Sequence, residues 1–331
     1  MYWNKLRKYL RLSRIHSAVL TGLTPVVAAA AANASLPIYH YIQLFLIGLL
    51  FHFYLFIYNE LRDISIDKTS EKLKEKPLID GSVTVKNAKI IIISSIILIL
   101  ILTIVFFQEK IIILIPISLL TLLFGGLYDT FGKSFHHADY FLATSIFLLA
   151  IYGGFSVLQE LTLIIYIICA LAFMQMLFQN IVAGLKDVDH DYLIKGMSTP
   201  LRMGVKIEGK YILITKKFIV YISILKIIQI ILLITPFAYY IIPFESWQFI
   251  ATVILIIIAL FFMIKFLTIK VFDREKIMRA IGFHEMFTFM VIPFILFSYI
   301  GIAGMLFLIF FPIIWLGVFL ILLYGRLMPI I

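Results

Sequence analysis

The sequence predicts an all-α integral membrane protein with nine or ten transmembrane helices. Of its 331 residues, 63% are hydrophobic and only 14% are charged. Its apolar runs also reach the roughly 20 residues that a helix needs to cross the hydrocarbon core of a bilayer, which is about 30 Å thick. Composition and run length together therefore indicate a chain that crosses the membrane many times.

Ten apolar segments are the candidate spans. In chain order they are 15–34, 40–58, 88–107, 111–127, 140–158, 161–182, 217–241, 247–268, 284–302 and 304–325. The number falls to nine if the last two form a single helix. A basic stretch, MYWNKLRKYLRLSR, precedes the first segment, which is long enough for a full span. We therefore interpret that segment as the first helix rather than as a cleaved signal peptide.

Basic residues predict the orientation of the spans, because Lys and Arg stay preferentially on the cytoplasmic side. With ten spans, 26 of the 28 Lys and Arg residues fall on one side of the membrane. The exceptions are Lys110, on the opposite side, and Lys226, within a span. We expect the cytoplasmic side to hold all the substantial polar segments, which are 59–87, 128–139, 183–216 and 269–283.

Net charge and cysteine content narrow the function classes. The net charge of +10 suits an anionic membrane surface and an anionic substrate, and nothing in the sequence indicates nucleic-acid binding. The single cysteine, Cys169, lies inside a predicted span, which excludes a disulfide within the chain and disfavours a redox role.

Two acidic motifs at the ends of long apolar segments carry the strongest functional signal. The first, in YNELRDISID, contains Asn59, Asp63 and Asp67, and the second, in GLKDVDHD, contains Asp187 and Asp191. Within each motif these residues recur every fourth position, so a helix would stack them on one face, one turn apart. Like charges at this spacing repel each other by about 0.2–0.5 kcal/mol per pair, and a bound cation would remove that penalty.

Oxygen ligands in this arrangement favour a site for Mg²⁺ and a diphosphate. Mg²⁺ is typically held by one or two carboxylates together with substrate phosphates. Asn59 would add a neutral oxygen, and Asn180 lies two turns before Asp187 on the same helix face. Basic residues near the motifs would neutralise the remaining charge of the diphosphate; they are Arg62, Lys76, Lys133, Lys186 and Lys195. The hydrocarbon part of the substrate would lie among the apolar spans.

The two motifs resemble those of the UbiA superfamily of intramembrane prenyltransferases. Asn59, Asp63 and Asp67 match its NxxxDxxxD motif, and Asp187 with Asp191 match its second motif, DxxxD. Further agreements in order and placement are Lys76-Pro77-Leu78, Tyr128, Lys133, Gly196, Thr199 and Gly204. Departures from the family pattern are Glu60 in place of an aspartate, Lys76 in place of an arginine, and a tenth span.

The resemblance implies a fold, a reaction and a set of site residues. The fold would be a single polytopic domain, 1–331, with helices around a central cavity and a cytoplasmic-side cap formed by the loops 59–87 and 183–216. The enzyme would bind a polyprenyl diphosphate through Mg²⁺, ionise its allylic carbon–oxygen bond and pass the prenyl chain to an acceptor. The metal ligands would be Asn59, Asp63, Asp67, Asp187 and Asp191, the four aspartates being catalytic. The residues contacting the diphosphate would be Asn59, Arg62, Tyr128, Lys133, Asn180 and Lys186.

Two questions stay open from the sequence. The acceptor is either an aromatic quinone precursor, the commoner role in the family, or a glycerol-phosphate lipid as in archaeal ether-lipid synthesis. Arg202, Lys206 and Lys210 would either bind the phosphate of such a lipid acceptor or hold the cap to lipid head groups. From another class, a secondary transporter would also place acids in the membrane. Transporter sites tend to lie near the bilayer midplane, whereas these aspartates lie at helix ends, which favours the enzyme. His284 and Glu285 open a predicted span. They would either assist deprotonation of the acceptor or, as the preferred interpretation, cap or anchor the start of that span.

Overall fold

The computed structural model describes residues 2–68, 73–132, 134–135, 137–193 and 196–327. Within them, nine helices are long and apolar enough to cross a membrane, and a shorter apolar helix, Ile15–Ala30, precedes these nine. The prediction of an all-α membrane protein with nine or ten spans is confirmed. The chain divides into two compact units, Met1–Thr130 with Thr144–Ile165 and Phe310–Ile331, and Phe131–Ala143 with Tyr166–Ile309.

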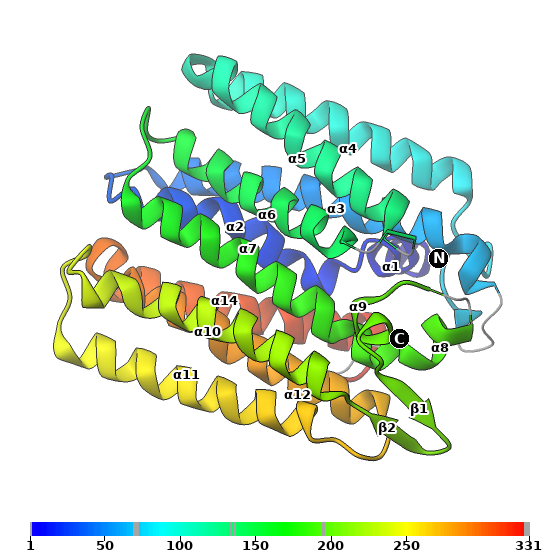
Figure 1. The fold of residues 1–331 in the computed structure, drawn as a ribbon. Helices are drawn as coiled ribbons and strands as arrows, with labels where there is room; N and C mark the ends of the chain where they lie inside the picture. Colours follow the sequence, from blue (N-terminus) through cyan, green and yellow to red (C-terminus); the bar gives the residue numbers. More distant parts are fainter. Residues whose placement is uncertain (1, 69–72, 133, 136, 194–195, 328–331) are drawn as a thin grey trace. The chain divides into compact units, whose positions relative to one another are not determined.

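The first unit contains the N-terminal helices and the C-terminal end of the chain (Figure 1). Its helices are α1 (Tyr2–Leu12), α2 (Ala18–Ala30), α3 (Ile38–Asp67), α4 (Val85–Phe106), most of α5 (Ile111–Phe131), most of α6 (Ala138–Phe155) and the later part of α14 (Phe297–Tyr324). Helix α3 packs against both α2 and α4. The two chain ends are joined where Arg7 Nε donates to the Leu323 carbonyl oxygen at 3.0 Å and Trp315 Nε1 donates to that of Ile15 at 2.8 Å.

Glycines allow the helices of this unit to approach closely. A Cβ atom on Gly48 of α3 would lie 2.8 Å from the Cα of Gly22 in α2. A Cβ atom on Gly153 of α6 would lie only 2.0 Å from the carbonyl oxygen of Pro25. Small residues at such contacts are a common way to pack helices in a membrane, where lipid removes the hydrophobic driving force between them.

We therefore expect Gly153→Ala to destabilise the protein by about 2–3 kcal/mol, because the added methyl group would collide with backbone rather than with a movable side chain. The measurement is the thermal unfolding midpoint of the purified protein in detergent. Gly317→Ala is the matched control, since nothing lies within 4 Å of the position its Cβ would take in α14. Equal midpoints for the two variants would contradict the close contact.

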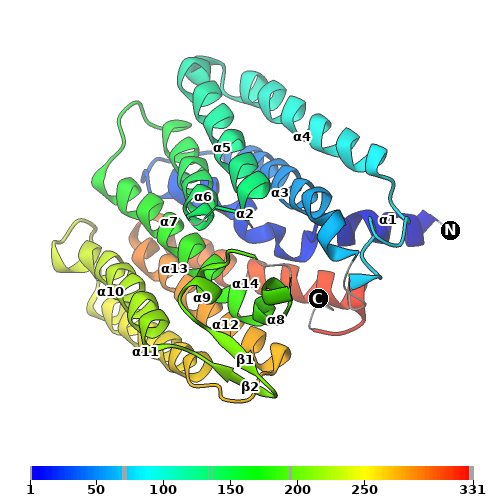
Figure 2. The same ribbon diagram turned by 45° about the vertical axis from the view of Figure 1, so that its right-hand side comes forward.

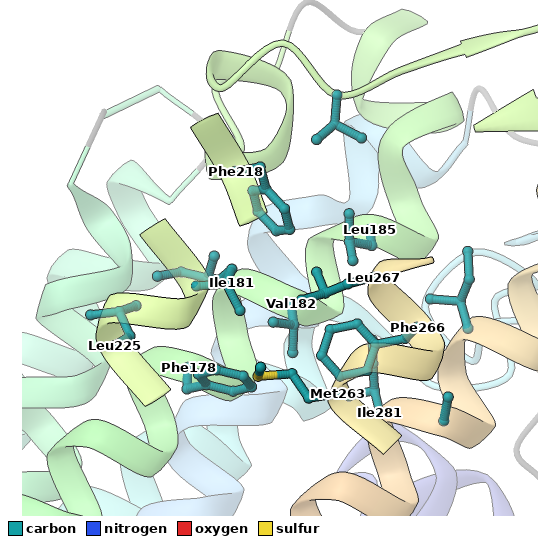
Figure 3. Packing of buried hydrophobic residues seen from close by; sticks show 14 of the residues in the cluster. Phe178, Ile181, Val182, Leu185, Phe218, Leu225, Met263, Phe266, Leu267 and Ile281 are labelled. Carbon is teal, nitrogen blue, oxygen red and sulfur yellow. The ribbon is translucent and has the colours of Figure 1, made fainter. Parts of the chain in front are cut away.

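The second unit contains a helical core and a small hairpin (Figure 2). Its elements are most of α7 (Leu163–Ala183), α8 (Val188–Leu193), α9 (Thr199–Arg202), β1 (Lys206–Glu208), β2 (Tyr211–Leu213), α10 (Lys216–Ala238), α11 (Ser246–Leu267), α12 (Arg274–Phe289), α13 (Val291–Ile295) and the start of α14. Buried side chains from α7, α10, α11 and α12 point toward one another in Figure 3. Phe178, Phe218, Phe266 and Ile281 are among them, so the core tightly joins these four helices.

Helix α12 begins ten residues before the predicted span 284–302, at Arg274. Its first turns, REKIMRAIGF, hold four charged residues that lower the hydropathy, yet Ile277, Ala280 and Ile281 are buried. Asp273 caps the helix by accepting a hydrogen bond from the backbone N–H of Lys276 at 3.0 Å. This acceptance lowers the pKa of the Asp273 carboxyl.

The prediction that His284 and Glu285 open a span is wrong, because both are buried well inside α12. The boundary predicted between the last two spans has a counterpart in a break within α14. Gly301 has a φ of 64°, a conformation that glycine adopts readily and that interrupts the helix. The predicted boundary, between residues 302 and 304, lies close to this glycine, although Phe297–Tyr324 counts as one candidate span.

A polar cluster lies in the middle of the helices of the second unit. Lys226 Nζ donates to Gln229 Oε1 at 3.0 Å and to Thr288 Oγ1 at 2.9 Å. Gln229 Nε2 donates to Gln175 Oε1 at 2.6 Å, and Gln175 in turn donates to Glu285. The cluster thereby links α7, α10 and α12 through a cation and a carboxylate that are joined by amides rather than by direct contact.

His284 extends the polar cluster into the apolar core. Its Nδ1 lies 3.1 Å from Glu285 Oε1, and its ring stacks on Phe178 with centroids 4.7 Å apart. Lys226 Nζ also lies 5.5 Å from the centroid of the Phe178 ring. Buried polar groups in a membrane are costly unless they are satisfied, so the cluster must be held together by its own hydrogen bonds.

Candidate active site

The first motif lies at the end of α3, in the first unit, and is already rich in ion pairs. Lys76 Nζ lies 2.7 Å from Asp67 Oδ2 and 3.1 Å from Glu60 Oε2. Arg14 Nη2 contacts the other oxygen of Glu60 at 2.5 Å. The sequence Lys76-Pro77-Leu78 thus returns a cation to the helix end, and Glu60, which departs from the family pattern, links two cations to the motif.

Burial makes Asp67 sensitive to the cation beside it. Asp67 is buried, and this raises the pKa of its carboxyl group, although the Lys76 ammonium opposes the shift. A second cation would stabilise the ionised form of a buried carboxylate such as Asp67, because removing an ionised group from water is costly unless it is paired.

Asn59 makes a contact that the sequence analysis did not foresee. Its Nδ2 donates to Asp129 Oδ1 at 3.2 Å, and Asp129 lies on α5 directly after Tyr128. Earlier on the same two helices, the hydroxyl of Tyr54 donates to the carbonyl oxygen of Leu122 at 2.9 Å. The motif asparagine is therefore held by a carboxylate from a neighbouring helix of the same unit.

The second motif lies just beyond the end of α7, in the second unit. A 3₁₀ turn, Gly184–Asp187, connects α7 to α8, and the Gly196 N–H donates to the carbonyl oxygen of Asp191 at 2.8 Å. The helical path continues through the motif as one apolar helix, Leu163–Tyr192. The predicted spacing of Asp187 and Asp191 by about one helical turn agrees with this path.

Arg274 holds the second motif from the start of α12. Its Nη2 lies 3.0 Å from Asp189 Oδ1 and 3.6 Å from Asp187 Oδ1, and its Nε donates to the Lys186 carbonyl oxygen at 2.9 Å. Lys186 Nζ itself lies 3.6 Å from Asp187 Oδ2. Two cations therefore reach Asp187, and one of them also fixes the preceding backbone.

Asn180 connects the second motif to its surroundings. Its Nδ2 donates to Asp139 Oδ1 at 2.6 Å, and the Thr199 hydroxyl donates to Asp139 Oδ2 at 2.5 Å. A single carboxylate thus ties the start of α6 and α9 to α7. The amide nitrogen of Asn180 is engaged in this link.

Of the other predicted site residues, two have a described position and two do not. Arg62 is exposed on α3, one residue before Asp63, and Tyr128 lies on α5 in the first unit. Lys133 and Lys195 fall outside the described residues. Since the two motifs belong to different units, the prediction that they share one site stays a prediction.

Charged residues at the motifs that were not predicted as site members include Asp129, Asp189 and Arg274. The adjacency of Asp129 to Tyr128, and the position of Asp189 inside GLKDVDHD, were signals that could have found the first two. Arg274 gave no such signal, because it comes from a distant helix. All candidate ligands of the motifs are oxygen donors, the kind that Mg²⁺ prefers. Among the described residues, no three His, Cys, Asp or Glu side chains form a metal site by themselves.

The fold defines a multi-pass membrane protein in which each of the two acidic motifs lies at the end of a long apolar helix. Residues 18–288 match the UbiA prenyltransferase family, and the chain belongs to that family. The resemblance seen in the motifs is thereby confirmed. A comparison with curated protein sequences finds no match.

Solved structures share the fold at low sequence identity. A digeranylgeranylglyceryl phosphate synthase is 19% identical with a TM-score of 0.64, over 90% of this chain and 100% of that one. A UbiA homologue from Aeropyrum pernix K1 is 14% identical with a TM-score of 0.64, over 91% and 98%. A UbiA homologue from Archaeoglobus fulgidus bound to DMAPP and Mg²⁺ is 18% identical with a TM-score of 0.62, over 86% and 99%.

Proposed function

We propose that this member of the prenyltransferase family transfers a polyprenyl chain from a polyprenyl diphosphate to an acceptor in a Mg²⁺-dependent reaction. The observation that carries the proposal is the pair of oxygen-donor motifs at helix ends, in a chain of this family. A homologue of the same fold has been solved with DMAPP and Mg²⁺, and another structure with GPP and Mg²⁺, which supports the choice of donor and metal.

The metal would be held by Asn59, Asp63, Asp67, Asp187 and Asp191. Bound Mg²⁺ would neutralise the charge that develops on the diphosphate as the allylic carbon–oxygen bond breaks. Arg62, Lys186, Tyr128, Lys133 and Asn180 would contact the diphosphate and fix its position.

The main role of Lys76 and Arg274 would be to hold the motif carboxylates in place, and not to bind the substrate. Each of them pairs with a motif aspartate and also makes a second contact nearby, to Glu60 or to the Lys186 backbone. Such contacts limit the rotamers of the carboxylates, and a restrained ligand set loses less entropy when a cation binds.

The site would face the cytoplasm beneath a cap formed by the loops 59–87 and 183–216. Support comes from the strong bias of Lys and Arg to one side of the predicted spans. The apolar channel for the prenyl chain would then lie within the bilayer, which is the environment its hydrocarbon prefers.

For the acceptor we propose an aromatic quinone precursor. A glycerol-phosphate lipid is the second candidate, since a synthase of such lipids shares the fold. Two of the basic residues predicted to bind the phosphate of this lipid already have other partners. Lys206 pairs with Glu208 at 2.5 Å, and Lys210 lies over the Tyr211 ring.

The test is turnover of labelled geranylgeranyl diphosphate by the purified protein, with and without Mg²⁺. Parallel reactions would offer an aromatic acid, a dihydroxynaphthoate and a prenylated glycerol phosphate. A metal-dependent prenylated product in one reaction would support the transferase and identify its acceptor class. Failure to bind or cleave the diphosphate, in protein that is folded and supplied with Mg²⁺, would overturn the proposal.

A further inference from the structure

Asp129 is a buried carboxylate that neither motif includes. It lies on α5 of the first unit and is 9% exposed. Its Oδ1 accepts the hydrogen bond from Asn59, whereas its Oδ2 is buried and has no hydrogen-bond partner among the described residues. An unsatisfied buried carboxylate oxygen costs free energy, so a side chain chosen only for packing would not carry one here.

The contact between Asp129 and Asn59 fixes which way the asparagine amide points. In the structure the NH₂ group of Asn59 faces Asp129, because Asn59 Nδ2 donates a hydrogen bond that Asp129 Oδ1 accepts. The carbonyl oxygen of Asn59 then points away from Asp129. A hard cation needs that oxygen, because the NH₂ group of an amide is not a metal ligand.

Other contacts hold α3 against α5 without help from Asp129. The Tyr54 hydroxyl donates to the Leu122 carbonyl oxygen, and the hydroxyls of Tyr58 and Thr130 lie 3.2 Å apart. On α3 both contacts come before Asn59, and on α5 they lie on either side of Asp129. A change at Asp129 should therefore alter the asparagine while the two helices keep their register.

We propose that Asp129 is a positioning residue of the first motif, which orients the Asn59 amide so that its carbonyl oxygen is presented to the cation. The proposal rests on the proposed function, since it assumes that the first motif binds a divalent cation. Partners that orient metal ligands typically change metal affinity by about 10–100-fold when they are removed. Asp129 acts on the metal through Asn59 alone, so its effect must disappear when Asn59 is absent.

The experiment measures Mn²⁺ binding by electron paramagnetic resonance, with a non-reactive prenyl diphosphate analogue present, together with the Mg²⁺ concentration that gives half-maximal turnover. We expect Asp129→Asn to weaken Mn²⁺ binding and to raise the half-saturating Mg²⁺ concentration by about 10-fold or more. Asparagine at this position can offer either its oxygen or its NH₂, so it no longer fixes the amide of Asn59. Tyr58→Phe is the control, because it removes a hydrogen bond between the same two helices and should leave both quantities unchanged.

A double-mutant cycle separates positioning from a general structural effect. Asn59→Ala combined with Asp129→Asn should bind Mn²⁺ as weakly as Asn59→Ala alone, whereas independent effects would add. If Asp129→Asn does not fold, Asp129→Ser supplies the same measurement with a smaller side chain. Unchanged Mn²⁺ affinity in the folded variant would overturn the role of Asp129. Absence of Mn²⁺ binding by the wild-type protein would instead overturn the proposed function.

Discussion

Asp63→Asn and Asp191→Asn should each give a folded, membrane-inserted protein that has lost most of its Mg²⁺-dependent turnover. Asparagine has nearly the shape of aspartate, so packing at the helix ends should be preserved. It lacks the negative charge that a hard cation requires, however, and each aspartate represents one of the two motifs. We expect kcat/KM to fall by on the order of 10²-fold or more, as when a preorganised electrostatic group is removed from an active site.

The measurement is turnover of the labelled prenyl diphosphate as a function of Mg²⁺ concentration, for each variant at equal amounts of monodisperse protein. Asp80→Asn makes the same chemical change at an exposed carboxylate outside both motifs, where Asp80 accepts a hydrogen bond from the Ser82 N–H at 2.7 Å. It should retain normal turnover. Wild-type rates in either motif variant would remove that aspartate from the site, and wild-type rates in both would refute the assignment of the two motifs.

The spans and motifs were predictable because both are encoded over short stretches of sequence. The predicted segments 217–241 and 247–268 agree closely with α10 and α11, which are strongly apolar apart from a few polar residues such as Lys226 and Gln229. The i, i+4 spacing of the aspartates likewise needs only one helix. Local periodicity is therefore enough to predict the apolar spans and the spacing of the motif aspartates.

Contacts between distant segments were not predictable in this way. Arg274 reaches Asp187 and Asp189 from the first turn of α12, and that helix was itself predicted to begin at residue 284 because its charged start hides an apolar face. The same charged turn places the arginine beside the second motif. The charged first turns of α12 therefore explain two errors: the helix start was predicted ten residues too late, and Arg274 was not predicted as a residue of the site.

The second large prediction concerns the polar cluster around Lys226, which lies on α10. Replacing Lys226 by methionine should destabilise the protein by about 3–5 kcal/mol, because it leaves the buried Glu285 without the cation that compensates it. Gln229 and Thr288 would also lose the hydrogen bonds that Lys226 donates. The thermal unfolding midpoint in detergent measures the effect. Lys217→Met is the control, since Lys217 is an exposed residue at the start of the same helix.

A variant that removes both Lys226 and Glu285 tests whether the two buried charges compensate each other. Lys226→Met combined with Glu285→Gln removes both the cation and the carboxylate, so it should be more stable than Lys226→Met alone, because no uncompensated buried charge remains. A double variant less stable than both single variants would mean that the two charges do not compensate each other.

Turnover in the double variant separates the cluster from the proposed site. Gln175, which bonds to Glu285 and to the Gln229 that accepts from Lys226, precedes Asp187 by about 18 Å of helix at 1.5 Å per residue. If the cluster is structural, the double variant should transfer prenyl groups with a nearly unchanged kcat once it is folded. A transporter would depend on ionisable groups at this depth, as the alternative function requires. Loss of turnover in a stable double variant would therefore bring these buried charges into the mechanism, and retained turnover would leave the reaction to the aspartates at the helix ends.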